Sequence, residues 1–260
     1  MRSMNIDAYL KRISYSGSLE PTADTLRELQ LAHLLTVPFE NLSIHSREPI
    51  VLEENALFAK IVERRRGGFC YEANGLFAGL LHALGFDVAM LGAGVANSQG
   101  EFGPNFDHMT LMVTLSDRWL VDVGFGDSFL EPLLLDSRVE QVQGTRAFKI
   151  VDDDDDHLIL LRRNLDADWE PQYRFTLQPY SFADYEEMCQ FHQTSPDSHF
   201  AKGRICSRAT ADGRVSLSEM RLITTTGPEQ RRDERTLKDQ DEYDCVLRDE
   251  FGIVMNVDKR

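Results

Sequence analysis

The sequence predicts an α+β fold in which a helical first third precedes an antiparallel β-sheet or barrel and a mixed C-terminal segment. Apolar residues recur at helical spacing up to about residue 85. From residue 86 to residue 177 they form short runs separated by Gly, Pro, Asn, Ser and Asp. Closely spaced runs of this kind are typical of antiparallel sheets and barrels. With 260 residues, the chain can bury a full core without disulfides or metals.

Three helices are predicted in the first third of the chain. A cap at residues 24–25 begins a helix that ends before Pro38. A second helix is predicted over residues 56–62, where apolar residues lie four apart. A third helix begins near Cys70, has one wide apolar face, and ends at Gly85.

The middle and the tail of the chain are predicted to be richer in strands. The predicted strands of the middle cover residues 86–95, 108–115, 118–123, 147–151, 158–161 and 173–177. A helix is predicted over residues 182–191. The tail has predicted strands at 205–210, 214–217 and 222–226 and a final helix at 244–251. Five consecutive Asp residues at 152–156 cannot lie in a core, so a solvated turn is preferred there to a metal site.

Composition excludes several classes of protein. The net charge of −15 argues against a nucleic-acid partner, because phosphate binding needs clustered Lys and Arg. No run of the sequence has the length and apolarity of a membrane span, and the N-terminus lacks the apolar core of a signal peptide. The four cysteines form no C-x-x-C pair, which disfavours a structural metal site. A cytoplasmic protein with reduced cysteines is expected.

The segment RRRGGFC, residues 64–70, places a cysteine where the third helix is predicted to begin. A thiol attacks as its thiolate, and a helix N-terminus supplies partial positive charge and unpaired N–H groups. The two glycines permit positive φ or a close backbone approach, and the three arginines add positive charge. These features predict a reactive Cys70 with a lowered pKa. The alternative is a buried cysteine packed at a helix start.

Cysteine catalysis also needs a base and a group that orients the base. Among the seven histidines, His108 is the candidate because it opens a predicted strand after a loop, although it would equally fit a structural histidine. Asp122 is a carboxylate within the apolar run WLVDVG and therefore needs a polar partner. Fourteen residues separate the two, which suits adjacent antiparallel strands joined by a turn at 116–117. His108 and Asp122 are thus expected at the same edge of the sheet.

In these features the chain resembles the arylamine N-acetyltransferases over nearly its full length. The motifs that carry the resemblance are PFENL at 38–42, RGGFC at 66–70 with Glu72 and Asn74, Asp107-His108, DVGFG at 122–126, and the weaker HQTSPDSHF from His192 and SRATADGRVSL from Ser207. The resemblance implies Cys70 as nucleophile, His108 as its base and Asp122 as orienter, a triad of the cysteine-protease type. It also implies an N-terminal helical bundle over residues 1–85, a β-barrel over 86–195 and an α/β lid over 196–260.

The resemblance further implies a ping-pong reaction. Cys70 takes acetyl from the cosubstrate acetyl-CoA as a thioester and passes it to an arylamine, arylhydrazine or N-hydroxyarylamine, with no metal and no tightly bound cofactor. Phe125, Asp127 and Phe129 match the segment that lines the acceptor pocket in this family. Phe39 and Phe69 are further candidate walls, since aromatic walls suit a planar amine, but both fit core packing equally well.

The sequence is also compatible with other assignments. A cysteine amidase or protease, or a related amide synthase that closes macrolactam rings, would use the same triad. A non-catalytic binding protein would tolerate loss of Cys70. Arg66, Glu40 and Asn41 are expected to tie the helical bundle to the Cys70 turn. The basic residues considered for contact with coenzyme A are Lys202, Arg204, Arg208 and Arg214.

Overall fold

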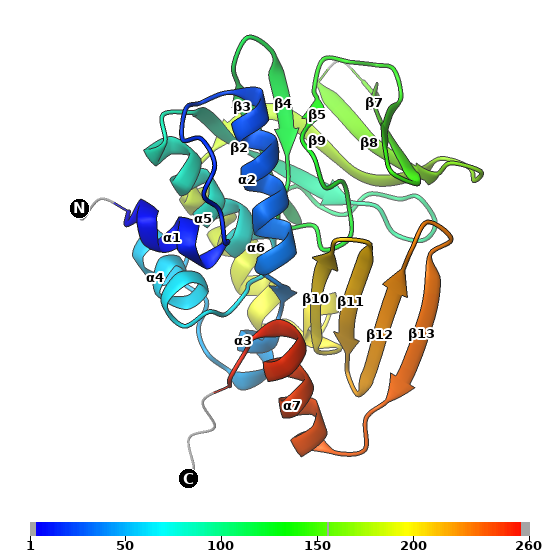
Figure 1. The fold of residues 1–260 in the computed structure, drawn as a ribbon. Helices are drawn as coiled ribbons and strands as arrows, with labels where there is room; N and C mark the ends of the chain where they lie inside the picture. The colour runs from blue at the N-terminus through cyan, green and yellow to red at the C-terminus, as the bar shows by residue number, and fades with distance from the viewer. Residues whose placement is uncertain (1–3, 155, 256–260) are drawn as a thin grey trace.

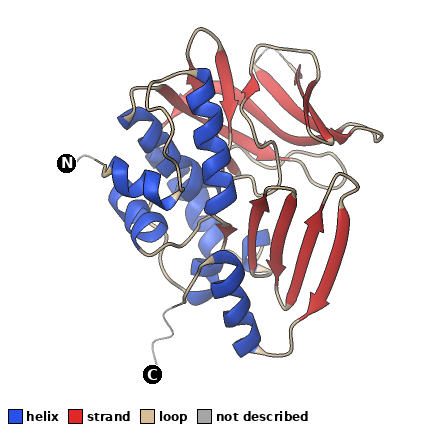
Figure 2. Ribbon diagram, viewed as in Figure 1, coloured by secondary structure: helices blue, strands red, loops and turns tan. Residues whose placement is uncertain are grey.

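The structure, a computed structural model, describes residues 4–154 and 156–255. Helices gather on one side of the molecule, and two antiparallel sheets lie on the other (Figures 1 and 2). Within the described residues, one sheet has eight strands and the other has five. The predicted α+β class is therefore confirmed. No helix in these two ranges combines the length and the apolarity needed to cross a membrane.

The first part of the chain is helical, as predicted. Its helices are α1 (Ile6–Arg12), α2 (Ala23–Thr36), α3 (Leu42–Ser46), α4 (Glu54–Phe58), the π-helical turn η1 (Ala59–Glu63) and α5 (Cys70–Ala83). The cap of α2 differs from the prediction, because the hydroxyl of Thr22 accepts from the backbone N–H of Thr25 at 3.2 Å. Gly85 follows α5 with φ of +89°, the left-handed stop that was predicted.

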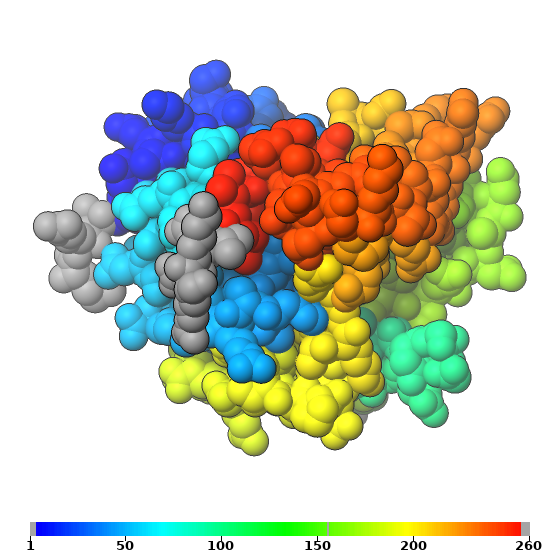
Figure 3. Space-filling view, turned by 90° about the horizontal axis from the view of Figure 1, so that it is seen from below, coloured from blue at the N-terminus to red at the C-terminus, as the bar shows by residue number. Residues whose placement is uncertain are grey.

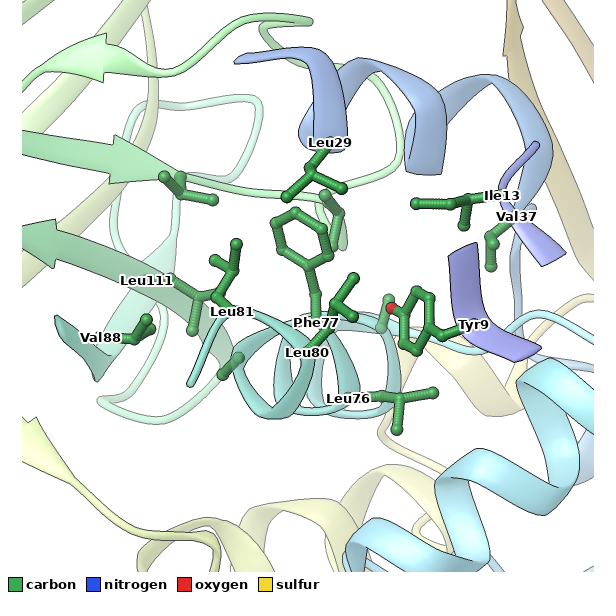
Figure 4. Close-up of a cluster of buried hydrophobic side chains, with 14 of the residues drawn as sticks. Tyr9, Ile13, Leu29, Val37, Leu76, Phe77, Leu80, Leu81, Val88 and Leu111 are labelled. Atoms are coloured by element: carbon green, nitrogen blue, oxygen red, sulfur yellow. The ribbon is translucent and has the colours of Figure 1, made fainter. Parts of the chain in front are cut away.

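Helix α5 runs through the main apolar core. Figure 4 shows Leu76, Phe77, Leu80 and Leu81 of α5 among side chains from the other helices and the sheet. The partners labelled there are Tyr9, Ile13, Leu29, Val37, Val88 and Leu111. A helix enclosed in this way must be apolar on most of its surface. The polar side chains at its first turns are buried as well, which already marks that end as unusual.

The eight-stranded sheet forms a nearly closed barrel, as predicted. Its strands are β2 (Asp87–Val95), β3 (His108–Thr114), β4 (Arg118–Val121), β5 (Leu133–Leu134), β6 (Gln141–Gln143), β7 (Arg146–Asp152), β8 (His157–Asn164) and β9 (Glu170–Tyr180), in the order β5-β4-β3-β2-β9-β8-β7-β6. The Gln141 side chain bridges the two edges by bonding both backbone groups of Leu134, at 2.8 and 3.1 Å. The acidic run forms the turn between β7 and β8, as expected; its Asp155 lies outside the described residues.

The second sheet joins distant parts of the chain. It orders β1 (Phe39–Glu40), β10 (Ile205–Thr210), β11 (Gly213–Ser218), β12 (Arg221–Thr226) and β13 (Arg231–Thr236). Helix α7 (Gln240–Phe251) packs against this sheet. Helix α6 (Phe182–Thr194) and the short helix η2 (His199–Ala201) lie between β9 and β10 in the chain. Since β1 comes from the helical part, this sheet crosses the expected boundary at residue 85. The ranges 1–85, 86–195 and 196–260 stay a prediction about folding units.

Candidate active site

Cys70 is the first residue of α5, and its thiol is buried, with 2% of the residue exposed. The Glu72 side chain accepts from the backbone N–H of Phe69 at 3.1 Å, which fixes the start of the helix. Gly67 lies so close to β1 that an added Cβ would be 1.9 Å from the carbonyl oxygen of Pro38. Of the two roles expected for the glycines, close backbone approach is the one found.

His108 and Asp122 lie in contact. The His108 Nε2 and Asp122 Oδ2 atoms are 2.6 Å apart, and both residues are buried. The ladder between β3 and β4 ends at the pair Leu111–Val121, and Asp122 is the next residue after that pair. The expected placement at one edge of the sheet is found, with one difference: β4 ends at Val121, and Asp122 follows the strand.

Asn74 connects this pair to α5. Its Nδ2 donates to the Met109 carbonyl oxygen at 2.6 Å and to Asp122 Oδ1 at 2.9 Å. Its Oδ1 accepts from the backbone N–H of Val123 at 2.8 Å. The sequence placed Asn74 in a motif but predicted no role for it. The available signal was its position four residues after Cys70, on the same face of the helix.

The electrostatics of Cys70 differ from the sequence prediction. Burial raises the pKa of the Cys70 thiol well above its ordinary value, and a hydrogen bond from the Met109 backbone offsets only part of that rise. Two of the three arginines do not supply the expected counter-charge, because Arg64 pairs with Glu48 and Arg66 with Glu40. A thiolate at this position therefore requires another cation beside it.

A buried ion cluster supports the turn before Cys70. Arg66 Nη2 is 2.8 Å from Glu40 Oε1, and Lys60 Nζ is 2.7 Å from Glu72 Oε1. Burial raises the pKa of both carboxyls. The positive charges of Lys60 and Arg66 outweigh burial at Glu40, so the pKa of Glu40 lies below its usual value. The pKa of Glu72 remains raised, because burial and the nearby negative charge of Glu40 both act against ionisation. The expected structural role fits Arg66 and Glu40.

Asn41 differs from that expectation. Its Nδ2 donates to the carbonyl oxygens of Phe200 at 3.0 Å and Gly203 at 2.7 Å, and its Oδ1 accepts from the Ile205 N–H at 2.8 Å. Asn41 thus ties the N-terminal part to the segment that enters β10, rather than to the Cys70 turn.

The aromatic residues proposed as acceptor walls fall into two groups. The Phe125 ring lies 5.1 Å from the His108 ring, and Phe39 is half-buried near Gly126 and Phe200. Phe69 and Phe129, in contrast, are fully buried in two different apolar clusters. Core packing therefore describes Phe69 and Phe129, while Phe125 borders the histidine.

Asp127 faces arginines. Its carboxylate is 2.7 Å from Arg146, 3.0 Å from Arg214 and 3.7 Å from Arg162. Burial raises the pKa of Asp127, but the three guanidinium groups outweigh burial and lower it. Asp127, Arg146 and Arg214 line a cleft of about 510 Å³ between the barrel and the second sheet. An acceptor contact through this carboxylate would compete with all three arginines.

The other basic residues considered for coenzyme A have different surroundings. Arg208 donates to the backbone oxygens of Leu35 and Glu250, and the Arg204 guanidinium lies 4.1 Å from the centre of the Tyr243 ring. Of the three arginines considered, Arg214 is the one that lines the cleft.

Comparison with known proteins agrees with this arrangement. The family profile described as N-acetyltransferase matches residues 22–260. The chain belongs to the arylamine N-acetyltransferase family. An arylamine N-acetyltransferase of Mycolicibacterium smegmatis is 36% identical over 222 residues, covering 83% of this chain and 80% of that protein.

The likeness holds for the fold as well as for the sequence. An arylamine N-acetyltransferase of Mycobacterium marinum in complex with CoA superimposes with a TM-score of 0.87 at 33% identity, covering 96% of this chain and 93% of that one. Proansamycin X synthase of Amycolatopsis mediterranei is 33% identical over 255 residues, covering 95% of this chain and 96% of that enzyme. The arylamine N-acetyltransferases that match in sequence and in structure, one of them with CoA bound, support arylamine N-acetylation as the activity of this chain.

Proposed function

We propose that the chain transfers acetyl from acetyl-CoA to the nitrogen of arylamines, arylhydrazines or N-hydroxyarylamines through a thioester on Cys70. The observation that carries this proposal is the buried His108–Asp122 pair, which Asn74 ties to the helix that begins with Cys70. We expect the enzyme to act in the cytoplasm, where its cysteines stay reduced.

In the first half-reaction, Cys70 gives its proton to His108 and attacks the acetyl carbonyl carbon. The bond from that carbon to the CoA sulfur breaks, and the departing CoA thiolate takes the proton from His108. Because Asp122 engages Nε2, the nitrogen available to the thiol is Nδ1. The imidazolium supplies the cation that a buried thiolate requires.

In the second half-reaction, the amine nitrogen attacks the Cys70 thioester and gives a proton to His108. The carbon–sulfur bond breaks, and the Cys70 thiol is regenerated. Backbone N–H groups at the first turn of α5 are the proposed donors to the oxyanion in both halves. Asp122 holds the ring orientation throughout.

For the substrates, we assign Phe125 and Phe39 as aromatic walls of the acceptor site, with Phe69 and Phe129 as packing behind it. We assign Asp127 to the cleft with Arg146 and Arg214, where it orients guanidinium groups toward the CoA phosphates. Asp127 lies two positions after Phe125 in the chain, a span of at most about 7 Å. That distance is short enough for one CoA molecule to reach both.

The first test is intact mass spectrometry after mixing the protein with acetyl-CoA, without and then with an arylamine. We expect one acetyl group on Cys70, discharged faster by the amine than by water, and none on Cys70→Ser. Discharge to water at the same rate would indicate an amidase instead.

The amide synthase is the second candidate, because proansamycin X synthase matches nearly the whole chain. A synthase would load poorly from acetyl-CoA and well from a long acyl thioester that carries its own amine. Comparing these two donors by the same mass measurement distinguishes the candidates.

A further inference from the structure

Three potential metal ligands converge beside the candidate active site. Asp107 immediately precedes β3, His192 lies in α6, and His199 begins η2. One ligand atom from each lies within 4.8 Å of the other two. We propose that Asp107, His192 and His199 bind a divalent cation of the zinc class.

The orientation of His192 is the first argument. His192 is 1% exposed, and its Nε2 atom has no hydrogen-bond partner of acceptable geometry among the described residues, although Asp107 Oδ1 lies 3.3 Å away. Its other ring nitrogen, Nδ1, is 3.1 Å from Ser198 Oγ. In metal-binding histidines, one ring nitrogen usually makes a hydrogen bond of this kind, which fixes the ring and directs the other nitrogen, here Nε2, toward the ion.

One ligand–ligand distance and the chemistry of all three ligands favour zinc. With zinc–ligand bonds of about 2.1 Å, two ligands of a tetrahedral site lie roughly 3.4 Å apart. The 3.3 Å between Asp107 Oδ1 and His192 Nε2 matches that edge. Two imidazoles and one carboxylate suit zinc better than magnesium or calcium. Exposed His199 gives the ion a path from solvent, and water would complete the four ligands.

The position suggests what the ion would do. Asp107 is the neighbour of His108, and the preceding Phe106 has φ of +67°, with its carbonyl oxygen accepting from the Tyr71 hydroxyl. An ion would join this loop to α6 and η2, because Asp107 lies beside His192 of α6 and near His199 of η2. The regions that contain the loop (green) and α6 with η2 (yellow) are neighbours on the face shown in Figure 3. The ion would therefore fix the position of Asp107, the residue immediately before His108 at the start of β3. Sequence spacing predicted no metal site, because these ligands come from separate segments.

The test measures zinc affinity by competition with a chromophoric chelator, in Cys70→Ser protein so that the active-site thiol cannot bind the ion. We expect one zinc per chain, no competition from a hundredfold excess of magnesium, and an affinity at least about tenfold lower in His199→Ala. Ser198→Ala should also weaken binding about tenfold, as loss of such a supporting partner does. His199 is exposed, so its removal should leave the fold intact by circular dichroism.

The matched control is His157→Ala, because His157 also lies beside a carboxylate, with Nδ1 2.8 Å from Asp154 Oδ1. That variant should bind zinc as the parent does. Unchanged affinity in His199→Ala, lost affinity in His157→Ala, or zinc binding that disappears with the Cys70 thiol would each overturn the proposal. None of these outcomes depends on acetyl transfer, so the metal site and the proposed function can fail separately.

Discussion

The Asn74 side chain donates to Asp122 Oδ1 at 2.9 Å. The first two turns of α5 therefore contain Cys70 and also bind the carboxylate that contacts His108. The same Asn74 binds the Met109 carbonyl oxygen, next to His108 in the chain. Helix α5 and the ends of β3 and β4 are thereby joined through one amide. The barrel alone positions His108 and Asp122, whereas the position of Cys70 relative to these two residues depends on Asn74.

Replacing Asn74 by Ala should slow acetyl loading of Cys70 about a hundredfold, since a displacement of about 1 Å can cost that much. The change also leaves the Met109 carbonyl and the Val123 N–H buried without this partner, at about 1–3 kcal/mol for each. Loading is measured by mass spectrometry well below the unfolding temperature. Asn97→Ala, in an exposed loop, is the control and should load normally. Equal loading by both variants would remove the positioning role of Asn74.

Asp122→Asn should reduce both activity and stability. An amide cannot stabilise an imidazolium as a carboxylate does, and loss of the orienting aspartate in a serine protease triad costs about 10⁴-fold in rate. We expect a loss of at least about a hundredfold in amine acetylation, measured at saturating acetyl-CoA. The buried amide must also face the donors at Asn74 Nδ2 and Gly124 N. A fully active Asp122→Asn enzyme would contradict the orienting role.

Local sequence patterns were sufficient to predict those parts of the site whose residues are close in sequence. His108 and Asp122 could be paired because His108 begins β3 and Asp122 directly follows β4, and a short turn joins these two strands. Helix α5 could be predicted because its apolar face and its glycine stop are continuous in sequence.

Features that depend on distant partners could not be predicted in this way. The Asp127–Arg214 pair spans 87 residues, and Arg66 is neutralised by Glu40 from another element. Strand β13 was missed because its residues, Arg231–Thr236, are all exposed and mostly charged, so no apolar alternation marks it. The predicted lowering of the Cys70 pKa was wrong for a related reason. Burial raises this pKa, and the depth of burial depends on tertiary packing that the local sequence does not show.

Arg66 and Arg64 allow a matched test of the buried ion cluster. Arg66→Met should lower the free energy of unfolding by about 3–5 kcal/mol, because Glu40 would lose its closest cation while remaining buried. Arg64→Met removes an exposed pair with Glu48 and should change stability by no more than about 0.5 kcal/mol. Both are measured by urea unfolding at pH 7. Similar losses in the two variants would show that burial of the Glu40 pair is unimportant.

Acid should destabilise the protein through His33. Burial, aided by the charge of Arg12, lowers the pKa of His33 to about 3, against an ordinary value of 6.5. As the pH falls below 6.5, the unfolded chain binds a proton that the folded chain does not, so the free energy of unfolding decreases. The slope from this one group is up to about 1.4 kcal/mol per pH unit.

The window from pH 6.5 to 4.5 tests His33 before most carboxylates titrate. His33→Leu should flatten the dependence of unfolding free energy on pH there, even though losing the 3.0 Å contact with the Tyr9 hydroxyl lowers overall stability. His82→Leu, at an exposed position, should keep the parent slope. If His33→Leu and the parent lose stability in parallel between these pH values, the buried neutral His33 is not the source of acid sensitivity.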